Sequence, residues 1–156
     1  MVLDKFDNAL LKLLQKDCLT PLRELADTVH LSTASVQRRI QKLRENGYIL
    51  ENVAVLDPEK MNQVITVIIE VRVKQTHITD LEALKESFSC PEIQQCYYVT
   101  GEADFMLVLL VPNMSSLQEI CDKLFHNNQN IQWFKTTVVL DRVKATLNIP
   151  ISEYIF

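Results

Sequence analysis

The stretch Ser32-Thr-Ala-Ser-Val-Gln-Arg-Arg-Ile-Gln-Lys-Leu-Arg-Glu-Asn-Gly47 decides how the first third of this chain folds. Ser32 offers a side-chain oxygen to the free amides of a first helical turn. Gly47, one of two glycines in the chain, stands where a helix end favours a left-handed residue. Between them Val36, Ile40 and Leu43 form one apolar stripe with helical spacing. The stretch therefore predicts an amphipathic helix that packs by one face.

The opposite face of this helix carries small and polar residues first and cations further along: Ala34, Arg38, Gln41, Lys42 and Glu45, with Ser35 at its edge. A helix that enters the DNA major groove has this arrangement. A solvated amphipathic helix with a basic face fits the stretch equally well, so the surrounding sequence has to decide.

Two further helices are predicted before this one. The first spans residues 3–16 with Asp4 as its N-cap, and the second begins at Thr20-Pro21, with Thr20 as N-cap, and ends near Val29. The positions expected to be buried are Phe6, Leu10, Leu13 and Leu14 in the first helix and Leu22, Leu25 and Val29 in the second. The short turn at His30-Leu31 then completes a helix-turn-helix unit.

A strand is predicted over residues 48–56, where it would serve as a wing or as an arm to a second domain, and Asp57-Pro58 ends it. The expected organisation is a DNA-binding domain over residues 1–50, a connecting strand or linker over 51–63 and a second domain over 64–156.

The second domain alternates strand and helix patterns. Strands are predicted over residues 65–73, 93–100, 105–111 and 131–143, and helices after the capping boxes Thr79-x-x-Glu82 and Ser115-x-x-Gln118. The order β-α-β-β-α-β predicts a ferredoxin-like fold, with four antiparallel strands and both helices on one face. The whole chain is thus expected to be α+β, with a winged-type helix-turn-helix domain first.

Residues Phe105–Val111 are apolar without interruption, which is typical of a strand covered on both faces. Since the two helices cover only one face, a second subunit is expected on the other, and we expect an obligate dimer.

Charge is distributed unevenly. The chain has a net charge of −4, but residues 1–50 carry eight Lys/Arg against six Asp/Glu and the remainder eight against fourteen. An acidic remainder repels DNA, so any DNA binding must be local to the first part. The four cysteines show no Cys-x-x-Cys spacing and the three histidines are scattered, so reduced, mostly buried thiols and no metal site are expected. Without a signal pattern or a long apolar run, the protein is expected in the cytoplasm and not in a membrane.

Motifs along the whole chain resemble the Lrp/AsnC (feast/famine) family of bacterial and archaeal transcriptional regulators. They are Leu3-Asp4-x-x-Asp7, Leu10-Leu11-x-x-Leu14-Gln15-x-Asp17, Leu31-Ser32-Thr33, Arg38-Arg39-Ile40-x-x-Leu43, Gly47-x-Ile49, Val99-Thr100-Gly101-x-x-Asp104-Phe105 and Val111-Pro112-x-Met114-Ser115. The second domain is then the family's RAM-type domain. The chain departs from the family pattern where His30 replaces a glycine, where Thr33 and Ala34 replace prolines, and at Gln129-Asn130 and Phe134. His30 is therefore expected to hold the turn in a left-handed conformation, which histidine tolerates better than most residues.

The resemblance implies that double-stranded DNA is bound through Ser32, Thr33, Ala34, Ser35, Arg38, Arg39 and Lys42. Arginine and lysine can neutralise phosphates or reach guanine O6 and N7, while the small residues allow close approach. We assign Arg38 to a base or groove contact and Arg39 to a phosphate. A surface ion pair is the alternative for either arginine.

The resemblance also implies a small amino-acid effector, bound at a subunit interface near Tyr98, Thr100, Gly101, Glu102, Ala103, Asp104 and Thr136. Asp104 can pair with the ammonium group, and amides near Gly101 can bind the carboxylate. An aspartate that only shapes the turn is the alternative. Ala103 and Phe134 make the pocket less polar, which favours leucine or methionine over asparagine.

The expected function is that of a sequence-specific DNA-binding transcriptional regulator, not an enzyme and without a cofactor. It is expected as a homodimer that assembles further to a tetramer or octamer, with assembly and DNA binding responding to the amino acid. One alternative is an architectural, nucleoid-type DNA binder with little effector response. The other is a relative of tetrapyrrole decarboxylases, with Arg72 and Arg142 to hold a polycarboxylate, although the sequence offers no nucleophile–base pair or His-rich pocket.

Overall fold

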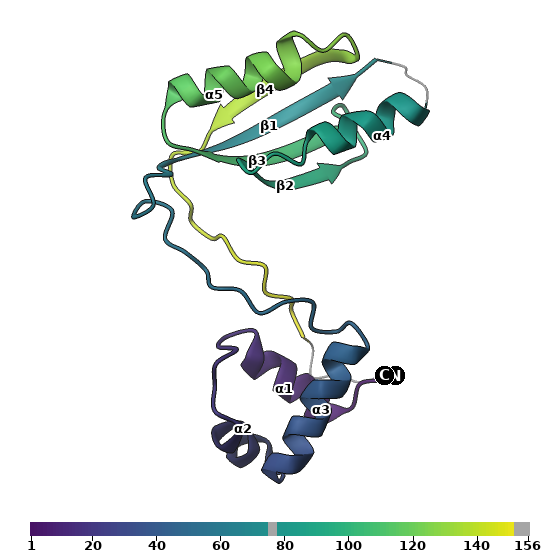
Figure 1. The fold of residues 1–156 in the computed structure, drawn as a ribbon, viewed down its shortest axis with the longest axis vertical. Coiled ribbons are helices and arrows are strands. Elements are labelled where there is room, and N and C mark those ends of the chain that lie inside the picture. Colours follow the sequence, from purple (N-terminus) through teal and green to yellow (C-terminus); the bar gives the residue numbers. More distant parts are fainter. Residues whose placement is uncertain (75–77, 152–156) are drawn as a thin grey trace. The chain divides into compact units, whose positions relative to one another are not determined.

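The computed structural model describes residues 1–74 and 78–151, the side chains of 78–80 excepted. The chain forms two compact units, one of residues 1–54 together with residues 144–151, the other of the described residues between 55 and 143. The second unit thus ends before the 64–156 domain predicted from the sequence does. The helices and strands are α1 (Lys5–Leu14), α2 (Leu22–Val29), α3 (Thr33–Glu45), β1 (Ile65–Val73), α4 (Ile78–Ser87), β2 (Ile93–Tyr98), β3 (Phe105–Val111), α5 (Met114–Cys121), η1 (Asp122–His126) and β4 (Ile131–Val138). Figure 1 labels the α-helices and the strands.

The first unit is the predicted three-helix arrangement. Its core contains Leu10 from α1, Leu25, Ala26 and Val29 from α2, and Val36, Ile40 and Leu43 from α3. Asp4 caps α1 as predicted, but Pro21 occupies the N-cap position of α2, because the hydroxyl of Thr20 donates to the carbonyl of Asp17 instead. Leu22, predicted to be buried, is 38% exposed, and Ala26 packs in the core instead.

Both ends of α3 are fixed as the sequence predicts. His30 has φ 56°, so a left-handed residue makes the turn from α2. The Ser32 hydroxyl accepts a hydrogen bond from the Ser35 amide at 3.2 Å. Gly47 has φ 74°, and the amides of Gly47 and Tyr48 donate to the carbonyls of Arg44 and Leu43, which is a Schellman end.

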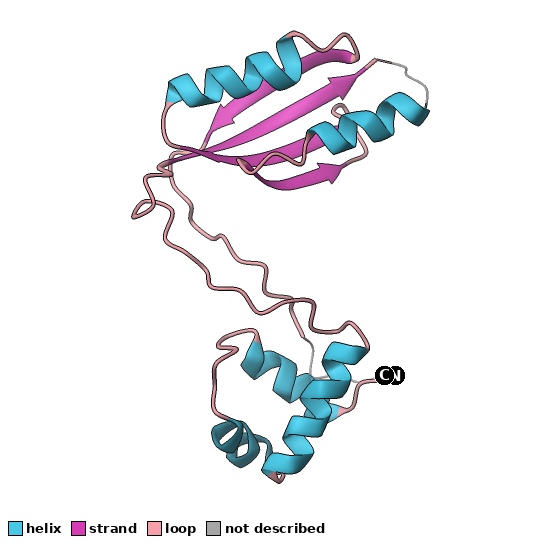
Figure 2. Cartoon of the chain, viewed as in Figure 1, coloured by secondary structure: helices cyan, strands magenta, loops and turns pink. Residues whose placement is uncertain are grey.

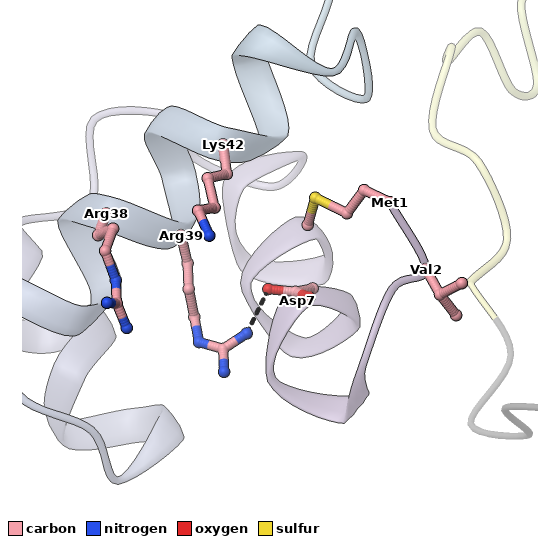
Figure 3. A pocket seen from close by; sticks show the side chains of 6 residues that line it. All are labelled: Met1, Val2, Asp7, Arg38, Arg39 and Lys42. Atoms are coloured by element: carbon pink, nitrogen blue, oxygen red, sulfur yellow. Dashed lines mark hydrogen bonds and ion pairs between the residues drawn. The ribbon is translucent and has the colours of Figure 1, made fainter.

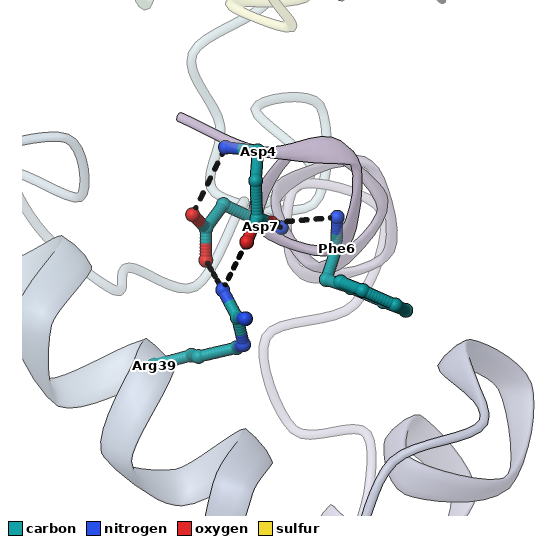
Figure 4. Close-up of polar contacts among 4 residues, drawn as sticks. All are labelled: Asp4, Phe6, Asp7 and Arg39. Atoms are coloured by element: carbon teal, nitrogen blue, oxygen red, sulfur yellow. Dashed lines mark hydrogen bonds and ion pairs between the residues drawn. The ribbon is translucent and has the colours of Figure 1, made fainter. Parts of the chain in front are cut away.

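Arg39 fastens α3 to the start of α1. Its Nη1 lies 2.7 Å from Asp7 Oδ1 (Figure 3) and 2.8 Å from Asp4 Oδ2 (Figure 4). The two aspartates also form a reciprocal capping box, and the guanidinium lies 5.4 Å from the ring centre of Phe6. The side chain of Asp7 is only 3% exposed, so its charge depends on this partner. We call these four residues the Arg39 clasp.

The pKa of the Asp4 carboxyl lies below its ordinary value. Burial alone would raise it, but hydrogen bonds from the amides of Asp7 and Phe6 and from the Arg39 guanidinium stabilise the carboxylate and lower it. The carboxylate therefore stabilises the fold fully above its unfolded pKa of about 3.9, and this contribution is lost as the pH falls through the lower folded value.

The predicted strand over residues 48–56 is not formed, so the helix-turn-helix unit has no wing. Leu50, Val53 and Val55 in this stretch are exposed. An alternating apolar pattern becomes a strand only where a partner pairs with it and buries one face. The last strand also stops early, at Val138 and not at residue 143. Beyond it, the backbone of Ile149 exchanges two 3.0 Å hydrogen bonds with the side chain of Gln15 on the C-terminal side of α1.

The second unit is the predicted ferredoxin-like fold. Its four antiparallel strands run in the order β2-β3-β1-β4, and α4 and α5 cover one face (Figure 2). The core between sheet and helices contains Val67, Ile69, Val71, Leu84, Phe88, Phe105, Leu107, Leu109, Val111, Leu117, Cys121, Leu124, Phe125 and Ile131. Asn113, not Ser115, caps α5, because its side chain accepts from the Ser116 amide at 2.8 Å. The capping box predicted at Thr79 lies outside the described side chains.

The other face of the sheet is less well covered in the single chain. Met106 on β3 is 37% exposed, whereas its neighbours Phe105 and Leu107 are 1% and 0% exposed. Ile68, Val108 and Leu110 share the face of Met106 and are half-buried. The uninterrupted apolar run of β3 thus has one face in the core and one outside it.

All four cysteines are free thiols, but the expectation that most are buried is wrong. Only Cys121 is buried, Cys18 and Cys90 are half-buried, and Cys96 is exposed. Among residues 1–74 and 78–151, no cluster of His, Cys, Asp and Glu could hold a metal ion. The helices described here are all too short or too polar to cross a membrane.

Replacing Arg39 with Met should lower the free energy of unfolding of the first unit by about 2 kcal/mol, because Asp7 stays buried without its charged partner. Urea unfolding followed by circular dichroism measures this change. Trp133, the one tryptophan of the chain, lies on β4 in the second unit, so the midpoint of its fluorescence should not move. An R39M chain whose helical signal is as stable as that of the wild type contradicts the clasp.

Replacing Asp4 with Asn should make the first unit less sensitive to acid. The wild type should lose stability between about pH 5 and pH 3, since the depressed pKa of Asp4 contributes there, and D4N should lose less. Helical circular dichroism during acid titration checks this, with Asp57→Asn as the control in the other unit. Equal acid loss in D4N and the wild type would refute it.

Candidate nucleic-acid interface and effector loop

The outer face of α3 presents five of the seven predicted DNA-binding residues to solvent. Thr33, Ala34, Arg38 and Lys42 are exposed, and Ser32 is exposed with its oxygen used as the helix cap. Ser35 is half-buried. Small side chains therefore occupy the first turn and long cations the next two, as a groove-reading helix requires.

Arg38 and Lys42 lie one helical turn apart and line the same pocket, of about 240 Å³. Its other walls are Met1, Val2, Asp7 and Arg39 (Figure 3). Among the described residues, neither Arg38 nor Lys42 has an ion-pair partner, so both charges are available to an anion. The pocket is lined by three cations and one carboxylate, so it is basic.

Arg39, which the sequence assigns to a phosphate, is half-buried and forms an ion pair within the first unit. Its Nη1 is held by two carboxylates in the Arg39 clasp, and its side chain is only 24% exposed. The hydrogen bond that Arg39 donates to Asp7 has the largest effect and raises the pKa of Arg39. Burial lowers this pKa, and the hydrogen bond that Arg39 donates to Asp4 raises it further. The ion pair that was the alternative reading for an arginine is what Arg39 forms. Arg39 therefore positions α3 and leaves the outward charge to its neighbours.

The predicted effector loop, Gly101–Asp104, connects β2 to β3 and is held at its last residue. Asp104 Oδ2 accepts from the Val73 amide at 2.8 Å. The Asp104 amide donates to the carbonyl of Val71, and its carbonyl accepts from the amide of Val99. Asp104 thus shapes the turn, as its alternative reading proposed, while its Oδ1 faces outward toward a cation.

That cation is Arg72 on β1, which the sequence reading did not place in the effector site. Its Nη1 lies 3.4 Å from Asp104 Oδ1, 3.0 Å from the carbonyl of Glu102 and 3.4 Å from that of Gly101. A signal was present in the sequence: Arg72 alternates with the buried Val71, and pairing of β1 with β3 brings its end to the loop. Arg72 and Asp104 become neighbours only because β1 pairs with β3, and the sequence alone does not predict this pairing residue by residue.

The loop itself is open on its outer side. Gly101 has φ 132°, and a Cβ built there would meet nothing within 4 Å. Glu102 and Thr100 are exposed, and Tyr98 is 61% exposed with its ring 5.0 Å from that of Phe105. These positions lie around one end of β2 and β3.

Thr136 does not belong to this group within one chain. It lies on β4 and pairs with Ile69, at the opposite edge of the sheet from β2. The argument from a less polar pocket is also not supported. Ala103 is buried, 8% exposed, and the ring of Phe134 packs against Phe125 at 4.8 Å.

Comparison with known proteins gives consistent results over both units. A family model described as the AsnC-type helix-turn-helix domain matches residues 3–44, and one described as the Lrp/AsnC ligand binding domain matches residues 66–149. The chain is 38% identical over 152 residues to an uncharacterized HTH-type transcriptional regulator, y4tD, of Sinorhizobium fredii, covering 97% of this chain and 90% of that protein.

Solved structures agree. An AsnC family transcriptional regulator from Agrobacterium tumefaciens superposes with a TM-score of 0.90 at 31% identity, covering 95% of this chain and 97% of that one. A transcriptional regulator from Neisseria meningitidis, solved as its complex with L-Met, gives 0.89 at 26% identity, covering 96% and 97%. The family and these relatives are transcriptional regulators and not enzymes, which removes the decarboxylase alternative. With its helix-turn-helix unit and its ferredoxin-like unit both matched, the chain belongs to the Lrp/AsnC family and is a DNA-binding transcriptional regulator.

Proposed function

We propose that this regulator recognises specific DNA sites through Arg38 and Lys42 and adjusts its assembly to a small amino acid bound beside Gly101–Asp104. The observation that supports the DNA contact best is the contrast between neighbours on α3. Arg39 is tied to two aspartates, whereas Arg38 and Lys42 line an open basic pocket. Arg38 then contacts base edges in the major groove and Lys42 a phosphate, with Thr33, Ala34 and Ser35 allowing close approach.

The functional unit we propose is a homodimer that assembles further to a tetramer or octamer. One α3 has few outward cations, and the remainder of the chain is acidic, so two helices together bind DNA much better than one. The partly exposed sheet face around Met106, Val108 and Leu110 supports this, since a second copy would cover it. We place this regulator in the cytoplasm, where a bacterial or archaeal DNA-binding protein meets its DNA.

The effector we propose is an amino acid, with leucine or methionine preferred over asparagine; what supports the preference is the methionine bound to a relative and not the polarity of the loop. The L-Met complex of the relative from Neisseria meningitidis supports this class of ligand. Asp104 would bind the ammonium and amides near Gly101 the carboxylate, with Tyr98, Thr100, Glu102 and Ala103 around them. Thr136 would join the site from another copy, because β4 and β2 lie at opposite edges of the sheet.

The effector acts in this proposal by shifting populations. A ligand at an interface favours the assembly in which its site is complete, by as much as its affinities for the two assemblies differ. The change of assembly alters how the α3 helices are spaced along DNA.

Arg38→Ala should abolish preference for the operator while leaving the fold intact, because it removes a base contact worth about 1–3 kcal/mol from each copy. Footprinting at fixed salt against competitor DNA measures it. Arg44→Ala is the matched control, since it removes one cation of the same helix outside the basic pocket. Unchanged operator affinity in R38A, or an equal loss in R44A, contradicts the assignment. A wild type with no preference over competitor DNA favours the architectural binder.

Asp104→Asn should weaken binding of L-methionine or L-leucine by tenfold or more, since a charge-assisted hydrogen bond to a carboxylate contributes about 1.5–3 kcal/mol. Calorimetric titration of the full chain with each of the twenty amino acids measures this, and sedimentation of the same samples reports assembly. Asp122→Asn on η1 is the control. Binding of no amino acid, undiminished binding by D104N, or a monomer at micromolar concentration would each remove a part of the proposal.

A further inference from the structure

Three oxygens converge on one nitrogen at the end of β1. They are the carbonyl oxygens of Gly101 and Glu102 and Oδ1 of Asp104, at 3.4, 3.0 and 3.4 Å from Arg72 Nη1. We call these three acceptors the ammonium cradle. All three come from the loop between β2 and β3.

The fit between Arg72 and the cradle is incomplete. A guanidinium Nη carries two protons in a fixed plane, so it cannot donate to three acceptors that surround it. Two of the three distances are 3.4 Å, longer than a good charge-assisted bond. A primary ammonium has three protons that rotate freely, and it can donate one to each acceptor.

Asp104, one of the three acceptors, is held in place without Arg72. Asp104 Oδ2 accepts from the Val73 amide at 2.8 Å, which leaves Oδ1 to face the bound cation. The backbone of Asp104 is bonded on both sides, to Val71 and to Val99. Replacing Arg72 by another cation therefore leaves the Asp104 carboxylate where it is.

The occupant can leave. The side chain of Arg72 is 38% exposed, and the space around the Gly101 Cα is open. A half-exposed ion pair of this kind is worth little more than about a fivefold factor in an equilibrium. Arg72 is therefore held weakly by the three acceptors, and a cation that donates better hydrogen bonds displaces it.

We propose that the cradle binds the ammonium group of the effector and that Arg72 is a built-in competitor, which fills the site until the amino acid displaces it. This inference rests on the proposed amino-acid effector and adds the Gly101 and Glu102 carbonyls to its site. The apparent affinity for the effector is lowered by the fraction of chains in which Arg72 occupies the cradle. The chain thereby sets the effector concentration at which it responds.

Displacement also changes the sheet surface. Arg72 pairs in register with Trp133 on β4, and both side chains stand on the face away from the helices. A guanidinium released from the loop gains access to the indole beside it, a favourable contact for a cation. Effector binding thus alters the charge pattern of the face that we propose a second copy covers.

The test is calorimetric titration of the full chain with L-methionine and with L-leucine, comparing the wild type with Arg72→Met. R72M keeps an apolar stem but not the charge, so it should bind either ligand about fivefold more tightly. Lys135→Met is the matched control, because it removes a cation of the same sheet face, which lies 3.4 Å from Glu70. K135M should match the wild type.

A second ligand separates competition from a general change in the loop. The α-hydroxy analogue of leucine lacks the ammonium group, so it should gain nothing from R72M. Thermal unfolding confirms that the variant is folded, and Arg72→Gln replaces it if it is not.

Equal affinities of R72M and the wild type overturn the inference, as does weaker binding to R72M, which would make Arg72 a ligand-binding residue and leave the effector proposal standing. An equal gain for the α-hydroxy analogue overturns it too. If neither the wild type nor R72M binds any of the twenty amino acids, the effector proposal itself fails and this inference fails with it.

Discussion

The ion pair between Arg39 and Asp7 is the interaction on which the DNA-binding unit depends. It joins a nearly buried carboxylate at the start of α1 to the middle of α3, and the same guanidinium holds Asp4, the cap of α1. The ion pair withdraws one cation from the surface, and in return it fixes the orientation of α3 against α1. Residues 38 and 39 differ by 100° around the helix, so Arg38 faces solvent while Arg39 pairs with the aspartates of α1.

Much of the fold followed from local rules in the sequence. The apolar stripe of α3, its Ser32 cap, its Gly47 end and the left-handed His30 are properties of a few neighbouring residues, and all were predicted correctly. The period-two pattern of β1 and the alternation of strands and helices likewise gave the ferredoxin-like unit, because each element has to bury one face.

Predictions failed where the deciding partner is distant or where two partners compete. Arg39 meets carboxylates more than thirty residues away, and no pattern within α3 distinguishes it from Arg38. Asn113 and Ser115 both suit a helix cap, and only the backbone decides between them. The stretch 48–56 has the composition of a strand but no pairing partner in one chain. Arg72 and Asp104 become neighbours only through the pairing of β1 with β3.

The strand order β2-β3-β1-β4 has a consequence for how such a regulator measures its surroundings. Tyr98 and Thr136 stand on the two outermost strands, so a ligand that touches both must draw them from different chains. A site divided in this way exists only where chains have met. Under the proposed function, occupancy of such a site would depend on the concentration of the protein as well as on that of the ligand, so the same ligand concentration would give a weaker response when the regulator is scarce.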